Sequence, residues 1–184
     1  MKRMLWILPA VFLLTGCTGS MPKTPEEMPP IVFEATSHTP EDEQNQVFRS
    51  FFDRNGVYYA AWDADMCTMR LDDLIEAYEN GELDEYKTEK SCDPAELFEM
   101  HKLLIALTRE PDFALEYPDA LPAVEAKSTT WYGIYYDADG NYAELRFHAH
   151  QQMTPIYGND DRARTITTWW AQTLAPEQEK ELPE

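Results

Sequence analysis

The apolar residues between positions 39 and 56 follow a helical spacing. Thr39-Pro40-Glu41-Asp42 would begin this helix, because threonine can cap a helix, proline suits its first turn and acidic residues favour its N-terminal dipole. The apolar residues that share one face are Val47, Phe48, Phe51 and Phe52. Asn55-Gly56 would end the helix, although the same pair also suits a hairpin turn between strands at 47–52 and 57–62. Of these two interpretations we expect the helix.

Two further helices are predicted in the middle of the chain. The first has a stripe of residues at helical spacing, Cys67, Leu71, Leu74, Ile75 and Tyr78, and Asn80-Gly81 would end it. The second begins at Asp93, because Asp93 and Glu96 have the spacing of a capping box. Its apolar stripe runs from Leu97 to Leu107, and Pro111 prevents its continuation. Within this helix His101, between charged neighbours, is expected to be exposed.

After Pro122 the period of the pattern changes from helical to alternating. Residues 129–136 and 142–150 are rich in β-branched and aromatic side chains, and 137–141 supplies turn residues between them, which predicts a hairpin. Residues 165–170 are expected to form a third strand, with a helix from Asp160 onward as the alternative. The sequence therefore predicts an α+β fold, in which two or three N-terminal helices are followed by a small antiparallel β-sheet.

The first seventeen residues have the three-part layout of a secretory signal. Lys2 and Arg3 precede an apolar run, which leads to the small residues of Leu14-Thr15-Gly16-Cys17. The run has about eleven residues, whereas a membrane-spanning helix needs roughly twenty. The final tetrapeptide resembles the lipobox of bacterial lipoproteins.

This resemblance implies that residues 1–16 are a signal peptide and that Cys17 becomes the lipidated N-terminus. Lipoproteins of this kind carry at least two acyl chains on the cysteine, palmitate being typical, and two chains give stable membrane anchoring. In the family, aspartate after the cysteine favours the inner membrane. Thr18 at that position therefore implies an outer-membrane anchor facing the periplasm.

Composition divides the mature chain into a tether, a domain and a tail. Residues 17–38 contain the lipidated cysteine and a proline-rich flexible tether, 39–174 a single globular domain, and 175–184 an acidic tail. The formal net charge is -19, which disfavours nucleic acid as a partner and suits a basic protein.

Cys67 and Cys92 remain once Cys17 is assigned to the lipid. An even number of remaining cysteines in an exported protein predicts a disulfide between them. Two buried free thiols are the alternative.

Three features of the hairpin are candidates for binding. The loop at 137–141 copies the first three ligand positions of a calcium loop, but its glycine stands fourth instead of sixth, so we expect a hairpin turn there. His148 and His150 lie two residues apart and would share one face of a strand, where they form a weak candidate metal site, but Arg146, which precedes them on that face, would repel a cation. Trp131, Tyr135 and Arg146 are expected to share a face of the sheet and to form a protein-binding patch.

Motifs of common enzymes are missing from the sequence. It contains no Gly-x-Ser-x-Gly elbow, no His-Glu-x-x-His and no phosphate-binding glycine loop, so we expect a non-enzymatic protein without a cofactor. The leading hypothesis is a cell-envelope lipoprotein with an acidic protein-binding domain, in an inhibitor, immunity or accessory role. The alternative is a periplasm-facing lipoprotein that binds a small ligand or a metal.

The lipid anchor can be tested by metabolic labelling with a fatty-acid analogue. We expect label on the wild type and none on Cys17→Ser, because the thioether requires the cysteine sulfur. The N-terminal peptide of the mature protein should start at residue 17. Equal labelling of the two proteins would contradict the assignment.

Overall fold

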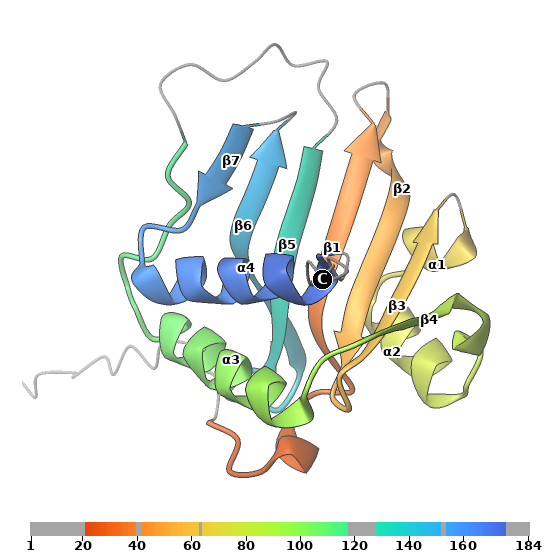
Figure 1. The fold of residues 1–184 in the computed structure, drawn as a ribbon, viewed down its shortest axis with the longest axis horizontal. Coiled ribbons are helices and arrows are strands. Elements are labelled where there is room, and N and C mark those ends of the chain that lie inside the picture. Colours follow the sequence, from red (N-terminus) through yellow and green to blue (C-terminus); the bar gives the residue numbers. More distant parts are fainter. Residues whose placement is uncertain (1–20, 40–41, 63, 118–127, 152–153, 176–184) are drawn as a thin grey trace, which may run out of the picture.

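The computed structural model describes residues 21–39, 42–62, 64–117, 128–151 and 154–175 as one antiparallel sheet with helices on both faces (Figure 1). The sheet has seven strands in the order β4-β3-β2-β1-β5-β6-β7. Their bounds are β1 Ile31–Thr39, β2 Asp42–Asp53, β3 Val57–Trp62, β4 Lys87–Ser91, β5 Ser128–Tyr136, β6 Tyr142–Gln151 and β7 Thr154–Tyr157.

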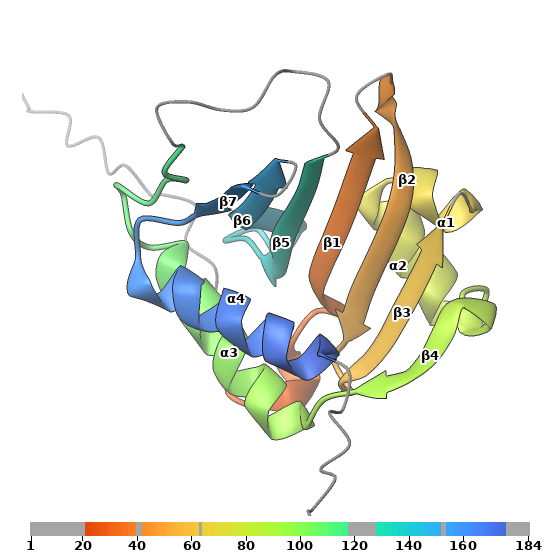
Figure 2. The same ribbon diagram turned by 45° about the horizontal axis from the view of Figure 1, so that its top comes forward.

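The helices form a layer on each side of the sheet (Figure 2). They are α1 Asp65–Thr68, α2 Leu71–Glu79, α3 Pro94–Leu107 and α4 Asp161–Leu174, with short 3₁₀ helices η1 Pro25–Glu27 and η2 Asp84–Tyr86. One apolar core joins α3 and α4 to the sheet, and a second core joins α1 and α2 to the opposite face.

The predicted order of helices before sheet was wrong. Three strands precede the first α-helix, and the sheet is the main element of the fold. The segment that we expected to be a helix is β2, and Asn55-Gly56 lies in the hairpin turn to β3. The physical reason is that Phe51 and Phe52 point into the two different cores, so β2 is apolar on both faces. A strand buried on both faces does not show a clear alternating pattern.

Asp53 fixes the turn between β2 and β3. Its Oδ1 accepts hydrogen bonds from the backbone N–H groups of Asn55, at 2.9 Å, and Val57, at 2.8 Å. Gly56 has φ +79, which is unfavourable for any residue with a Cβ. Local residues therefore determine this turn. They include Asn55-Gly56, the pair that also suits the end of a helix.

The third predicted strand, at residues 165–170, is also wrong, because these residues belong to α4. Asp160 caps this helix by accepting a hydrogen bond from the N–H of Arg162 at 2.8 Å. The buried side chains of α4 are Ala163, Ile166 and Trp170, which have helical spacing. Tertiary packing thus outweighs the β-propensity of the Thr-rich and Trp-rich sequence.

Other local predictions are confirmed. Asp93 begins α3 and accepts a hydrogen bond from the N–H of Ala95 at 2.8 Å. The strands β5 and β6 pair as the expected hairpin around residues 137–141. The helix predicted over 67–78 occurs as two pieces, α1 and α2.

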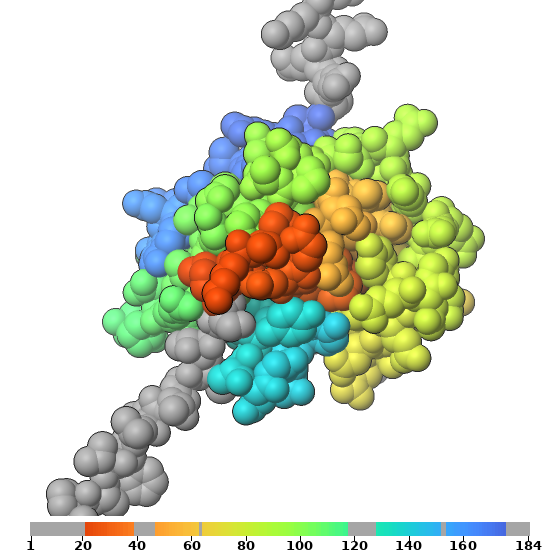
Figure 3. All heavy atoms as spheres, turned by 90° about the horizontal axis from the view of Figure 1, so that it is seen from below, coloured from red at the N-terminus to blue at the C-terminus, as the bar shows by residue number. Residues whose placement is uncertain are grey.

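The segment assigned to the tether enters the domain earlier than predicted. Residues 31–39 form β1, which pairs with both β2 and β5 at the centre of the sheet. Met28 just before it is fully buried. In Figure 3, η1 lies at the surface of this end of the molecule, beside α3 and the turn between β5 and β6.

A buried ion pair connects the sheet to α1. The Nε of Arg49 on β2 donates to Oε1 of Glu34 on β1 at 2.8 Å, and both side chains are almost fully buried. The Nη1 of Arg49 also donates to the carbonyl oxygens of Met66, at 3.1 Å, and Met69. Burial raises the pKa of Glu34, and Arg49 opposes this shift.

Helix α3 packs closely against Gly133 of β5. A Cβ placed on Gly133 would lie 2.2 Å from Cδ2 of Leu104, well inside van der Waals contact. Leu104 is fully buried in the core between α3, α4 and the sheet. The distance between α3 and β5 therefore depends on the absence of a side chain at position 133.

A double-mutant cycle can test this contact. Gly133→Ala should lower the free energy of unfolding by about 1–3 kcal/mol through overpacking, and Leu104→Ala by about 2–5 kcal/mol through a cavity. The double mutant should lose clearly less than the sum, because the shortened side chain leaves room for the new methyl group. Urea unfolding measures all three changes.

Gly140→Ala provides the matched control. A Cβ at Gly140 would meet no atom within 4 Å, although φ there is +84. This substitution should cost about 1 kcal/mol through the backbone alone and should be additive with Leu104→Ala. Additivity of Gly133→Ala with Leu104→Ala would contradict the described packing.

Candidate ligand-binding site

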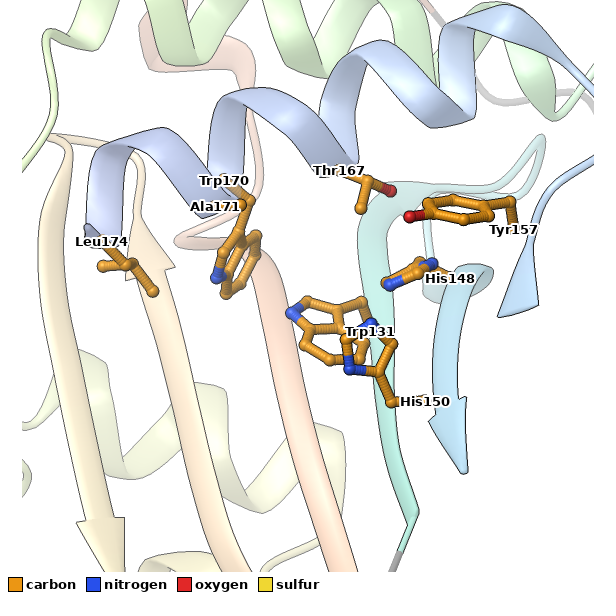
Figure 4. Close-up of a pocket in the computed structure, with 8 residues that line it drawn as sticks. All are labelled: Trp131, His148, His150, Tyr157, Thr167, Trp170, Ala171 and Leu174. Carbon is orange, nitrogen blue, oxygen red and sulfur yellow. The ribbon is translucent and has the colours of Figure 1, made fainter. Parts of the chain in front are cut away.

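A cavity of about 370 Å³ lies between α4 and the strands β5, β6 and β7 (Figure 4). Ligand-binding pockets typically have volumes of about 300–1,000 Å³, so this cavity is at the small end of that range. Its eight lining residues are Trp131, His148, His150, Tyr157, Thr167, Trp170, Ala171 and Leu174.

Aromatic rings in mutual contact form the sheet side of the cavity. The ring centroid of Trp131 lies 4.8 Å from that of His148 and 5.0 Å from that of His150. His148 in turn lies 4.8 Å from His150 and 4.9 Å from Tyr157. Because these four residues come from three adjacent strands, backbone pairing positions them relative to one another.

An irregularity in β6 determines which residues face the cavity. Trp131 pairs with His148 but Tyr132 pairs with Arg146, which leaves Phe147 as an extra residue. Such a bulge shifts the alternation of side chains along a strand. Phe147 and the two histidines consequently share the α4 side of the sheet.

Helix α4 supplies the opposite wall. Thr167, Trp170, Ala171 and Leu174 follow the i, i+3, i+4, i+7 spacing of one helical face. The indole of Trp170 is 5% exposed, and its ring centroid lies 5.2 Å from that of Phe52. This packing holds the cavity-facing side of α4 in place.

The cavity carries no formal charge at neutral pH. Burial and the neighbouring His150 lower the pKa of His148 to about 4, against a hydrogen bond to the backbone of Ile156. Burial also lowers the pKa of His150. No lining residue is Asp, Glu, Lys or Arg, although the chain contains 34 acidic residues. The acidic character of the protein therefore does not extend into this cavity.

The predicted protein-binding patch does not form one surface. Trp131 lines the cavity, and Tyr135 is 9% exposed on the same face of the sheet. Arg146 lies on the opposite face, paired with Tyr132, whose pKa is raised by burial while the nearby Arg146 opposes the shift. The bulge at Phe147 explains the difference, since Arg146 and the histidines would otherwise share a face.

The histidine pair lies together as predicted, but a metal site lacks further ligands. Among the described residues, no group of three His, Cys, Asp or Glu side chains is placed to hold a metal ion. The Asp137 loop, which resembles the start of a calcium loop, is a hairpin turn, where Oδ1 of Asp137 accepts from the N–H groups of Asp139 and Asn141 at 2.9 Å.

The remaining predicted residues are the three cysteines. Cys17 lies outside the described residues. Cys67 and Cys92 are free thiols near opposite ends of β3: Cys67 Sγ is 3.6 Å from the carbonyl oxygen of Ala61, and the N–H of Cys92 donates to the carbonyl of Gly56 at 2.8 Å. Their pairing stays a prediction, which mass spectrometry of unreduced protein would test.

Five of the eight lining residues are not among the candidates that the sequence predicts. Tyr157 was not selected, and all four α4 residues were assigned to a strand or left aside. The helical period of Ala163, Ile166 and Trp170, together with the capping residue Asp160, was the signal that could have found them.

Comparison with known proteins gives no match, whether with family models, curated proteins or solved structures. Within the part of the chain that the structure describes, no helix combines the length and apolar character needed to cross a membrane. The function of the cavity is therefore inferred from its lining residues and their arrangement.

His101 on α3 is buried between this helix and strand β5. It is 1% exposed, and its Nε2 lies 2.9 Å from the carbonyl oxygen of Ile134, to which it donates. Nδ1 has no hydrogen-bond partner among the described residues. Burial lowers the pKa of His101 to about 4. The expected exposure of this residue was wrong.

This pKa predicts a loss of stability in mild acid. Between about pH 6.5 and pH 4 the unfolded chain binds a proton at His101 that the folded protein does not, so the free energy of unfolding falls as the pH decreases. The full effect is about 3 kcal/mol. His101→Gln, which keeps a donor for Ile134, should remove that part of the pH dependence in urea unfolding measured from pH 7 to pH 4. An unchanged pH dependence would contradict the burial of a neutral imidazole.

Proposed function

We propose that the protein is a lipid-anchored protein of the cell envelope whose domain binds a small molecule in the cavity between α4 and the sheet. The observation that carries this proposal is the cavity itself, which is concave, largely apolar and uncharged. Sites for small molecules typically combine an apolar lining with a few polar groups that orient the ligand.

The energetic argument rests on the apolar lining. Trp131, Trp170 and Leu174 present apolar surface to a space wide enough for water. Transfer of such surface out of water contributes about 25 cal/mol per Å², so a ligand of matching shape gains binding energy without rearrangement of the fold. Wall residues held by backbone pairing and helix packing reduce the entropy that binding must overcome.

The envelope location is supported by the lipobox-like tetrapeptide that ends at Cys17. The hypothesis of a basic protein partner stays a prediction from net charge. Its proposed anchoring patch loses support, because Trp131 lines the cavity while Arg146 lies on the other face of the sheet.

Two neighbouring positions on α4 allow a matched test. Ala171 lines the cavity, whereas the adjacent Gln172 is exposed and does not. Ala171→Trp should fill part of the cavity, and Gln172→Trp should place the same indole outside it. Near-UV circular dichroism checks that both variants keep the native fold.

A set of neutral and charged fragments can then be screened by thermal unfolding. A fragment at a hundred times its Kd should raise the free energy of unfolding of the wild type by about 2.7 kcal/mol. Gln172→Trp should respond equally, and Ala171→Trp should respond clearly less. The proposal fails if no fragment stabilises the wild type, or if Ala171→Trp responds as the wild type does.

A further inference from the structure

We infer that the ligand of this cavity is a small, uncharged aromatic molecule with one hydroxyl or N–H group, and that this group binds to the imidazole of His148. The inference rests on the proposed function and specifies its ligand. Three properties of the cavity support it: its charge, its rings and its unused hydrogen-bonding capacity.

The lack of charge excludes ionic ligands. Transfer of an ion from water into an apolar site is strongly unfavourable unless an opposite charge compensates for it. The lining offers no carboxylate and no lysine or arginine, and both histidines are neutral at pH 7. A carboxylate, phosphate or ammonium group would therefore lose its hydration without gaining a partner.

The rings favour a flat aromatic ligand over a saturated one. Trp131, His148, His150 and Tyr157 form a continuous group of rings on the sheet side, and Trp170 faces them from α4 (Figure 4). Offset and edge contacts between aromatic rings add about 0.5–1.5 kcal/mol beyond the area they bury.

The volume sets the size of the ligand. An engineered apolar cavity of about 150 Å³ binds benzene. The cavity described here, with a volume of about 370 Å³, has room for two fused rings and a small substituent.

The hydrogen-bonding group follows from His148. This side chain is 2% exposed, and its Nδ1 has no hydrogen-bond partner among the described residues. A buried polar atom without a partner costs about 1–3 kcal/mol. Nδ1 has almost no accessible surface, so a ligand recovers this energy when the imidazole turns about its Cβ–Cγ bond and presents Nδ1 to the cavity. On the helix wall, the hydroxyl of Thr167 already donates to the carbonyl oxygen of Ala163 at 2.9 Å.

Four two-ring compounds test the inferred properties of the ligand one at a time. We would titrate the wild type at pH 7 with 2-naphthol, 2-methoxynaphthalene, naphthalene-2-carboxylate and 2-decalol, using isothermal titration calorimetry. The ether lacks the donor, the carboxylate adds a charge, and decalol is saturated. We expect 2-naphthol to bind at least tenfold more tightly than each of the others. For the ether, tenfold is the difference that one hydrogen bond of ordinary strength makes. For the carboxylate and for decalol, the difference comes from the uncompensated charge and from the lost aromatic contacts.

His148→Phe keeps a ring at the position but removes the hydrogen-bonding nitrogens. In this variant 2-naphthol and its methyl ether should bind with Kd values within about twofold of each other, a difference smaller than an ordinary hydrogen bond makes. A preserved preference for naphthol in folded His148→Phe would overturn the contact with His148. The four-compound comparison on the wild type does not depend on this variant.

Ala171→Trp distinguishes failure of the ligand class from failure of the proposed function. If the carboxylate or decalol binds as tightly as naphthol, and Ala171→Trp weakens that binding, the cavity binds ligands but the inferred class is wrong. If none of the four binds while other fragments respond to Ala171→Trp, the class is again wrong and the function stands. If Ala171→Trp changes no binding at all, the proposed function fails as well.

Discussion

The packing of Phe33, near the start of β1, is the contact on which both the sheet and the cavity depend. Phe33 is fully buried, and its ring centroid lies 5.9 Å from that of Phe147 on β6 and 5.8 and 6.0 Å from those of Trp169 and Trp170 on α4. The strand that carries it joins the two halves of the sheet, because β1 pairs with β2 on one side and with β5 on the other. Phe33 thus sets how α4 rests on the sheet, and the cavity is the space that this arrangement leaves beside it.

Elements with complete local signals could be predicted from the sequence. The cap at Asp93 and the turn at residues 137–141 each need only a few neighbouring residues, and both occur as expected. The remaining elements depend on partners far away in the chain. The β2 strand lies between two cores, so Phe51 and Phe52 are both buried and the alternation that identifies a strand is lost. For α4, β-branched residues and tryptophans concealed a helix whose stability comes from packing against the sheet.

The candidate site could be predicted in part, for similar reasons. Trp131, His148 and His150 were selected from the sequence, and the structure brings them together. Arg146 was assigned to the same face because strict alternation was assumed, and a single extra residue at Phe147 invalidates that assumption. His101 shows the limit of reading a residue from its neighbours: Glu99 and Lys102 are charged, yet the imidazole between them points into the core.

The position of η1 determines where a ligand would come from. With the lipid on Cys17 that we propose, only three residues lie between the anchor and Met21, and the four Cα-to-Cα steps reach at most about 14 Å. The end of the molecule that carries η1 would therefore rest close to the bilayer. Helix α3 contacts η1 on one side and α4 on the other (Figure 1). The cavity is lined by α4 and not by α3. Both helices would therefore lie between the membrane and the cavity. A ligand would then enter from the aqueous periplasm, and molecules dissolved among the lipid chains would have no direct path to the site.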